Sequence, residues 1–195
     1  MTYSIIGSGN VGTALARHFA RNGIDVAIAN TRGPDTLAAL AKELGEKIIP
    51  KTLQEALKAD TVIFAIPFRA YREVARESTN WNGKIVIDAM NPYGVPPEEL
   101  GGQPSSDLVA AALPGAKVVK AFNQLPAAVL GSAPQQNGGR RVVFVSSNHE
   151  DAAIAVVRLA EQLGFAPISL GKIAEGGLLL QLGAPLVLKN LIKQG

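Results

Sequence analysis

The sequence predicts an α/β fold: a Rossmann-type, doubly wound and mainly parallel sheet with a small C-terminal helical extension. The first observation is a short β-branched run at residues 3–6, expected to be a strand. It leads into Gly7-Ser8-Gly9-Asn10-Val11-Gly12 and a helical pattern over residues 13–22. This order of strand, glycine-rich turn and helix is the context of a dinucleotide-binding fingerprint. The second is the apolar run over residues 61–66, typical of a strand buried on both faces of a parallel sheet.

The composition indicates one folded domain without nucleic-acid or metal chemistry. The 195 residues are 47% apolar, which suits a single Rossmann domain with a core over about 1–146 and a C-terminal cap over about 147–195. The net charge of +3 is spread without basic blocks, and only 5% of residues are aromatic, which argues against a nucleic-acid partner. The chain has no cysteine, and His18 and His149 match no metal-ligand spacing, so no metal site is expected.

Nothing in the sequence predicts a membrane partner. The chain starts directly on a strand without a signal-peptide pattern, and the apolar stretch 176–188 is interrupted by Gln181, Gly183 and Pro185. A cytoplasmic protein is therefore expected.

Each residue of the glycine-rich motif has a predicted place around a pyrophosphate. Gly7 permits the tight turn, Gly9 lets the phosphates approach the backbone, and Gly12 lets the helix pack on its strand. Ser8, Asn10 and Val11 complete the loop and the helix N-terminus, whose free N–H groups bind anions. The alternative is an ordinary glycine-rich turn between a strand and a helix.

The end of the second strand, residues 25–29, indicates which dinucleotide is bound. NAD-binding folds usually place a carboxylate there for the ribose 2′-hydroxyl, but this chain has Asn30, Thr31 and Arg32. A hydroxyl beside a guanidinium suits a 2′-phosphate, so NADP(H) is predicted. Arg32 as a solvated loop cation is the alternative.

The next elements place residues at the carboxyl edge of the sheet. A helix is expected from Pro34 to about residue 44, then a short strand at 48–49 and a helix with the capping box Thr52 to Glu55. Ile66 ends the strand at 61–66 and Pro67 and Phe68 follow it, and ligands bind outside such carboxyl ends. These three residues are expected to flank the cofactor, although Phe68 could equally belong to the core.

A long proline-rich loop, residues 89–97, follows the expected strand 84–88. Long loops at strand ends frequently carry function. Asn91 is a candidate to hydrogen-bond the nicotinamide side of the cofactor, and Tyr93 offers a stacking face. Both could instead only shape the turn.

The remaining chain continues the alternation of helices and strands. Helices are expected at 105–113, capped by Ser105 or Ser106, and at 150–163, capped by Asn148; strands are expected at 117–122, 141–146 and 166–170, with a polar turn at 135–139. The apolar segment 178–193 is expected to form a buried or partner-packed helix, so a homodimer through this helix is predicted.

The sequence nominates no catalytic residue. Asp88 lies at a strand end and Glu175 in a loop, but nothing ties either to a substrate. Hydride transfer between two cofactors needs little from side chains beyond alignment, whereas a hydroxyacid dehydrogenase needs a general acid.

Most of the chain resembles the NADPH:coenzyme F420 oxidoreductases, and it is similar to the cytosolic domains of six-transmembrane metalloreductases, which pass hydride from NADPH to flavin. The matching motifs are residues 6–12, Thr31-Arg32, Ala65-Ile66-Pro67, residues 118–127, and residues 171–174. The resemblance implies that Thr31 and Arg32 hold the 2′-phosphate, and that the loops at Pro67, Asn91 and Ala121 wall the acceptor pocket with the C-terminal segment. Asn123 departs from the histidine that archaeal members carry there.

The sequence therefore predicts an NADPH-dependent oxidoreductase that exchanges hydride with coenzyme F420 or with a flavin, FMN or FAD. Two alternatives stay open: an NADPH reductase of a small carbonyl or imine compound, with Tyr93 as its donor, and a non-catalytic NADP-binding redox sensor.

Overall fold

The apolar runs of the sequence form the strands of one sheet. The structure, a computed structural model, describes residues 1–78 and 80–195. The strands are β1 (Tyr3–Ile6), β2 (Val26–Ala29), β3 (Ile48–Pro50), β4 (Thr61–Phe64), β5 (Ile85–Asp88), β6 (Lys117–Ala121), β7 (Gln135–Gln136), β8 (Gly139–Ser147), β9 (Ala166–Ser169) and β10 (Ile192–Gln194). Their order is β10-β8-β6-β5-β4-β1-β2-β3, and β7 and β9 also pair with β8.

Strands β1 to β6 pair in parallel, whereas β8 runs antiparallel to β6. Ile5, Ile63, Ile87 and Val119 stand in register across four neighbouring strands, and all four belong to the same core cluster. Their neighbours Val62, Val86 and Val118 point to the opposite cluster. Apolar residues on both faces explain why the strands appear as continuous apolar runs in the sequence.

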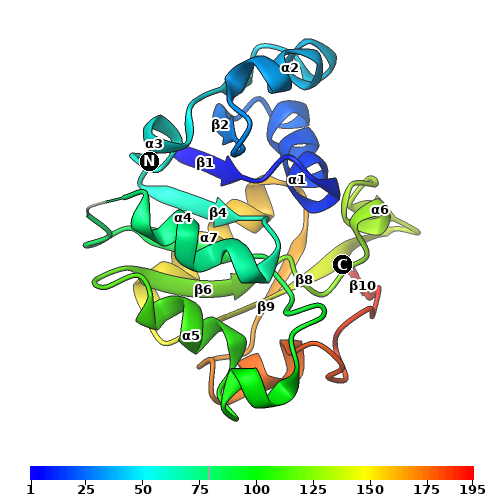
Figure 1. Cartoon of the computed structure of the whole chain (residues 1–195). Helices are drawn as coiled ribbons and strands as arrows, with labels where there is room; N and C mark the ends of the chain where they lie inside the picture. Colours follow the sequence, from blue (N-terminus) through cyan, green and yellow to red (C-terminus); the bar gives the residue numbers. More distant parts are fainter. Residues whose placement is uncertain (79) are drawn as a thin grey trace.

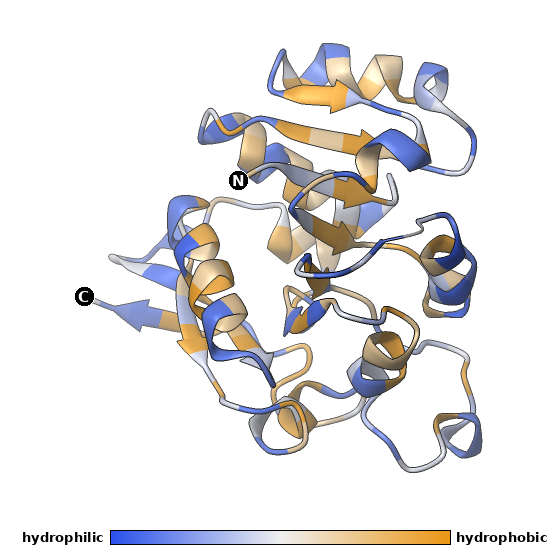
Figure 2. Cartoon of the chain, turned by 90° about the vertical axis from the view of Figure 1, so that its left-hand side faces the viewer, coloured by the Kyte–Doolittle hydropathy of each residue, from blue (hydrophilic) through white to orange (hydrophobic). Residues whose placement is uncertain are grey.

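Helices cover both faces of the sheet, with α4 and α5 on one face and α7 on the other (Figure 1). The central strands of the sheet are mainly hydrophobic, whereas β10 beside the C-terminus is mainly hydrophilic (Figure 2). The helices are α1 (Asn10–Arg21), α2 (Ala38–Leu44), α3 (Leu53–Ala56), α4 (Tyr71–Arg76), α5 (Ser105–Ala111), α6 (Ala127–Leu130) and α7 (Glu150–Gln162), with 3-10 turns η1 (Pro34–Leu37), η2 (Phe68–Ala70), η3 (Pro97–Leu100) and η4 (Gly176–Leu180).

This three-layer arrangement confirms the predicted fold class. After β3 the chain returns to the other side of β1 to form β4, so the strand order reverses between β1 and β4. Crevices at such reversals, outside the carboxyl ends of the strands, are where open α/β sheets bind ligands.

The predicted C-terminal helix over 178–193 is wrong. Only η4 is helical there, and an irregular segment leads to β10, which pairs with β8. Gly183 has a φ of +85°, and Pro185 cannot donate a helical hydrogen bond, so a continuous helix is excluded. The segment from residue 176 to 191, named the C-terminal strap below, instead packs Leu180 and Leu186 against Val142 and Phe144 of β8.

Three smaller predictions also differ from the structure. Residues 135–139 are not only a turn, because β7 pairs with the start of β8. Pro104, rather than Ser105 or Ser106, precedes α5. His149 precedes α7, and the Asn148 side chain instead accepts the Ile173 N–H at 3.1 Å.

Residues beyond 146 contribute to the main sheet and its core. Strand β9 pairs with β8, and Ala152, Val156 and Leu159 of α7 pack in the same cluster as Phe19 of α1. Among the described residues, no helix has both the length and the apolarity that crossing a bilayer requires.

Candidate cofactor-binding site

Gly7 and Gly12 are required by the fold itself. Gly7 has a φ of +111°, and a Cβ on it would lie 2.2 Å from the carbonyl oxygen of Ala65. A Cβ on Gly12 would lie 1.9 Å from the carbonyl oxygen of Gly7. Both glycines therefore let β1, β4 and α1 approach closely, and this requirement does not depend on a ligand.

Gly9 is different, because the protein leaves open space beside it. Its φ is −77°, which any residue adopts, and an added Cβ would meet no atom of the described residues within 4 Å. Gly9 precedes α1, whose first N–H groups receive no side-chain cap. An exposed glycine beside free helix N–H groups fits a pyrophosphate, which must approach the backbone closely.

The loop after β2 is joined to the glycine-rich turn through Asn30. The Asn30 amide donates to the Ser8 hydroxyl at 3.0 Å, and its Oδ1 accepts the backbone N–H of Arg32 at 2.8 Å. Thr31 and Arg32 are exposed, and among the described residues the Arg32 guanidinium has no ion-pair partner. A free cation thus stands at the predicted 2′-phosphate position.

A cleft of about 490 Å³ lies at the carboxyl ends of β1, β4, β5 and β6. It brings together the predicted residues Asn10, Val11, Ile66, Pro67, Phe68 and Asn91, and also Ala65, Arg69, Ala89, Met90, Tyr93, Asn123, Leu125, Pro126 and Ala127. A larger hollow of about 740 Å³ lies at the exposed hairpin of β7 and β8, but no predicted site residue lines it. The sheet-edge cleft is therefore the candidate site.

Phe68 belongs both to the cleft and to the core. It lines the cleft, but it is only 6% exposed and its ring lies 4.9 Å from that of Tyr71. Arg69 holds the long loop over the cleft, because it donates to the Gly94 carbonyl at 2.9 Å and pairs with Glu99 at 3.3 Å.

The structure does not bring Ala121 into the cleft. Its side chain is fully buried in β6 and packs in the core cluster that contains α7, whereas Asn123, two residues further on, lines the cleft. Phe122 between them is fully buried with a φ of +61°, a costly conformation for a bulky side chain. This turn points Phe122 into the core and Asn123 toward the cleft.

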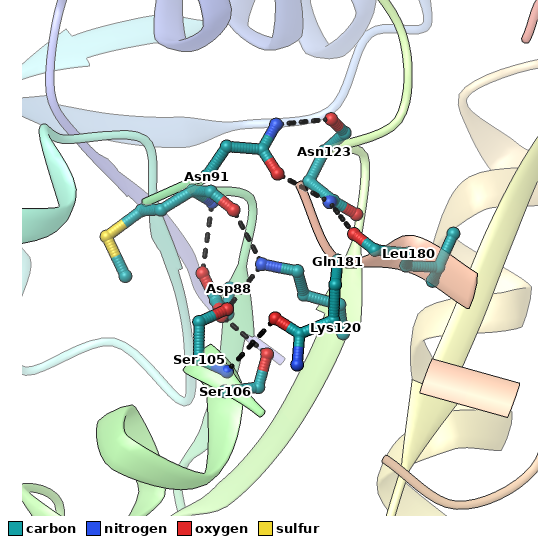
Figure 3. Close-up of polar contacts among 9 residues, drawn as sticks. Asp88, Asn91, Ser105, Ser106, Lys120, Asn123, Leu180 and Gln181 are labelled. Atoms are coloured by element: carbon teal, nitrogen blue, oxygen red, sulfur yellow. Dashed lines mark hydrogen bonds and ion pairs between the residues drawn. The ribbon is translucent and has the colours of Figure 1, made fainter. Parts of the chain in front are cut away.

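Sequence reasoning also missed a buried polar network beneath the cleft (Figure 3). Lys120 Nζ lies 3.1 Å from Oδ2 of Asp88, and Ser106 donates to the same oxygen at 2.7 Å. Asn91 and Asn123 exchange hydrogen bonds: Asn91 Nδ2 donates to the Asn123 carbonyl at 2.8 Å, and Asn123 Nδ2 to Asn91 Oδ1 at 3.0 Å. The sequence does carry a sign of this network: Lys120 lies inside an apolar strand, and Asp88 lies at the end of the neighbouring strand.

The C-terminal strap is attached to this network. Asn123 Nδ2 also donates to the Leu180 carbonyl at 2.8 Å, and the Leu188 N–H donates to the Gln124 carbonyl at 2.6 Å. Among the described residues, no group of three His, Asp or Glu side chains could hold a metal ion.

The fold, the uncapped helix beside Gly9 and the cleft at the strand-order reversal define an NADP-binding oxidoreductase domain. Comparison with known proteins agrees. Residues 2–92 match the family model described as NADP oxidoreductase, coenzyme F420-dependent. A solved structure of a hypothetical protein from Sinorhizobium meliloti is 45% identical, with a TM-score of 0.95 over 100% of this chain and 96% of that one. The chain belongs to the same family as that protein, and its residues 2–92 match the NADP oxidoreductase model.

Two further relatives carry functional names. A candidate F420-dependent NADP reductase from Arthrobacter sp. FB24 is 27% identical, with a TM-score of 0.73 over 92% of this chain and 90% of that one. Metalloreductase STEAP3 of Rattus norvegicus is 30% identical over 87% of this chain. The chain spans about a third of the length of the curated metalloreductases it matches, 34% for STEAP3.

Proposed function

We propose that the protein is an NADPH-dependent oxidoreductase that transfers a hydride between NADP(H) and coenzyme F420 or a flavin. The observation that carries this proposal is the character of the cleft beside the fingerprint. Its lining is mainly apolar, and among the described residues that line it only Arg69 and Tyr93 are titratable. A cleft that aligns flat rings without supplying a buried acid suits hydride exchange between two cofactors.

The residues of the chain supply binding and alignment. The N–H groups of α1 beside Gly9 bind the pyrophosphate, and Thr31 and Arg32 bind the 2′-phosphate. When bound, NADPH supplies the hydride. Val11, Ile66 and Pro67 pack around the nicotinamide and exclude water from the cleft.

The choice of acceptor is supported by the family model and by the names of the relatives. The model is described as F420-dependent, and the Arthrobacter protein is named for the same coenzyme. STEAP3 is named a metalloreductase.

Reduction of a small carbonyl or imine compound is a second candidate, because the hydroxyl-bearing Tyr93 lines the cleft. Tyr93 is 64% exposed, so its hydroxyl is poorly shielded from water as a proton donor. A redox sensor without turnover is a third candidate, which predicts tight NADPH binding but no oxidation.

The test follows NADPH absorbance with coenzyme F420, FMN, FAD or a panel of carbonyl and imine compounds in separate assays. Rapid oxidation with F420 or a flavin alone is expected. Turnover only with carbonyl or imine compounds would reject the proposal in favour of the second candidate, and NADPH binding without oxidation would favour the sensor.

We also propose a cytoplasmic homodimer that associates through the C-terminal strap rather than through a helix. Five leucines of this strap are between 39% and 62% exposed: Leu178, Leu179, Leu182, Leu188 and Leu191. Exposed apolar patches are frequent at protein interfaces. Light scattering of the wild type and of Leu188→Lys tests this, and a monomeric wild type would contradict it.

A further inference from the structure

The buried pair Asp88–Lys120 has no part in the function proposed above, yet it lies directly beneath the cleft. Asp88 is fully buried and Lys120 is 3% exposed, with 3.1 Å between Oδ2 and Nζ. Desolvating two charges costs several kcal/mol per ion, and apolar residues of similar size are frequently as stabilising. Fold stability alone is therefore a weak explanation for this pair.

The pair binds both polar groups of the Met90 backbone. Asp88 Oδ1 accepts the Met90 N–H at 3.0 Å, and Lys120 Nζ donates to the Met90 carbonyl oxygen. Ser106 fixes the carboxylate from the other side. Two opposite charges thus set the orientation of the Met90 backbone, and with it the direction in which the chain continues to Asn91.

The orientation of the Met90 backbone sets the position of the next residue, Asn91, whose side chain lines the cleft. Its amide exchanges two hydrogen bonds with Asn123, and Asn123 Nδ2 also donates to Leu180, so the Asn123 amide has one favourable orientation. The Asn91 amide retains one N–H and one oxygen lone pair beyond these bonds. Both residues line the cleft.

We propose that Asp88 and Lys120 are positioning residues that hold Asn91 so that its amide binds the carboxamide of the nicotinamide ring. A carboxamide has one acceptor oxygen and donor N–H groups, which match the free groups of Asn91. The proposal rests on the proposed function, because it requires the nicotinamide end of NADP(H) to occupy the cleft. The ion pair then selects which face of the ring is turned toward the acceptor.

The test compares two ligands by calorimetry: NADPH, and 2′,5′-ADP, which has the 2′-phosphate and adenosine but no nicotinamide. Lys120→Met is expected to weaken NADPH binding about tenfold, the effect of losing a hydrogen bond, and 2′,5′-ADP binding less than about twofold. Lys117→Met is the matched control, because Lys117 lies in the same strand but pairs with the exposed Asp151. It should leave both affinities unchanged.

Equal losses for the two ligands would assign the pair a purely structural role and overturn the proposal, as would unchanged NADPH binding. Because Lys120→Met leaves Asp88 buried without its partner, the double variant Asp88→Asn/Lys120→Met, which removes both charges, provides a second measurement with the same expected result. Asn91→Ala should reproduce the difference between the ligands, and NADPH binding at wild-type strength in that variant would also overturn the proposal. Wild-type protein that binds neither ligand would instead contradict the proposed function itself.

Discussion

The side-chain amide of Asn30 lies 3.0 Å from the Ser8 hydroxyl and joins the loop after β2 to the glycine-rich turn after β1. The same side chain accepts the Arg32 N–H at 2.8 Å, so Asn30 holds both loops together. The glycine-rich turn would face the pyrophosphate, and the loop after β2 would face the 2′-phosphate. Neither contact involves a carboxylate. The loop after β2 therefore lacks the group that usually binds the ribose 2′-hydroxyl of NAD.

Replacement of Arg32 with alanine should weaken NADPH binding about tenfold to a hundredfold, because a charge-assisted bond to the 2′-phosphate is lost. NADH lacks that phosphate, and its affinity should change less than about twofold. Fluorescence titration with both cofactors measures the difference. Arg76→Ala, an exposed arginine at the end of α4, is the control, and equal losses for both cofactors would reject the assignment.

Asn30→Asp should shift the preference toward NADH. A carboxylate at the end of β2 accepts a hydrogen bond from the ribose 2′-hydroxyl and repels a 2′-phosphate. The ratio of NADH to NADPH affinities should rise at least about tenfold. Asn30→Ala also removes the amide N–H that donates to Ser8, without adding charge, so a similar rise in that variant would show that the carboxylate is not the cause.

Gly9→Ala and Gly12→Ala should separate binding from folding. A methyl group on Gly9 meets no atom within 4 Å in the part of the chain that the structure describes, so the melting temperature should stay unchanged while NADPH binding falls. A methyl group on Gly12 would lie 1.9 Å from the Gly7 carbonyl, and the free energy of unfolding should fall by about 2 kcal/mol or more. Thermal melts and cofactor titrations of both variants check this pair, and unaltered NADPH affinity in Gly9→Ala would contradict the pyrophosphate site.

Tyr93→Phe distinguishes the acceptor classes. Hydride exchange with a deazaflavin or flavin should keep its rate, since the ring face of residue 93 is retained. Reduction of a carbonyl compound that takes a proton from the Tyr93 hydroxyl should slow about a hundredfold. Steady-state rates with each acceptor provide the measurement, and a large loss with F420 or a flavin would require a catalytic role for this hydroxyl.

His18 should make the protein less stable as the pH falls. Burial lowers the pKa of His18 below its ordinary 6.5, in a site where Nε2 contacts the Leu130 carbonyl and Nδ1 has no hydrogen-bond partner among the described residues. Below pH 6.5 the unfolded chain binds a proton at His18 more readily than the folded chain does. The contribution of neutral His18 to the free energy of unfolding is therefore present above pH 6.5 and is lost as the pH falls toward the folded pKa. Melting temperatures of His18→Gln should depend less on pH than those of the wild type, and His149→Gln, in an exposed turn, should not alter the profile.

The strands and the first binding loop were accessible from the sequence because their signals are local. Residues 61–66 are apolar whichever way they point, and only glycine fits the positions of Gly7 and Gly12. The capping box of Thr52 and Glu55 was also predicted correctly, since it depends on contacts three residues apart.

The C-terminal strap could not be predicted in the same way. Its leucines suggested a helix, but Gly183, Pro185 and the long-range bonds to Asn123 and Gln124 decide its path. Exposure of Leu188 and burial of Leu180 follow from those bonds rather than from any periodicity in the segment.

The sequence by itself determined the buried parallel strands, the dinucleotide fingerprint and the absence of a carboxylate after β2, since each depends on residues that are neighbours in the chain. Only the tertiary structure decided that Asn123 rather than Ala121 lines the cleft, and that Asp88 and Lys120 meet beneath it. The latter two residues are 32 positions apart and come together because β5 and β6 pair in register. Contacts of this kind depend on strand order and on the backbone turn at Phe122, neither of which leaves a local pattern in the sequence.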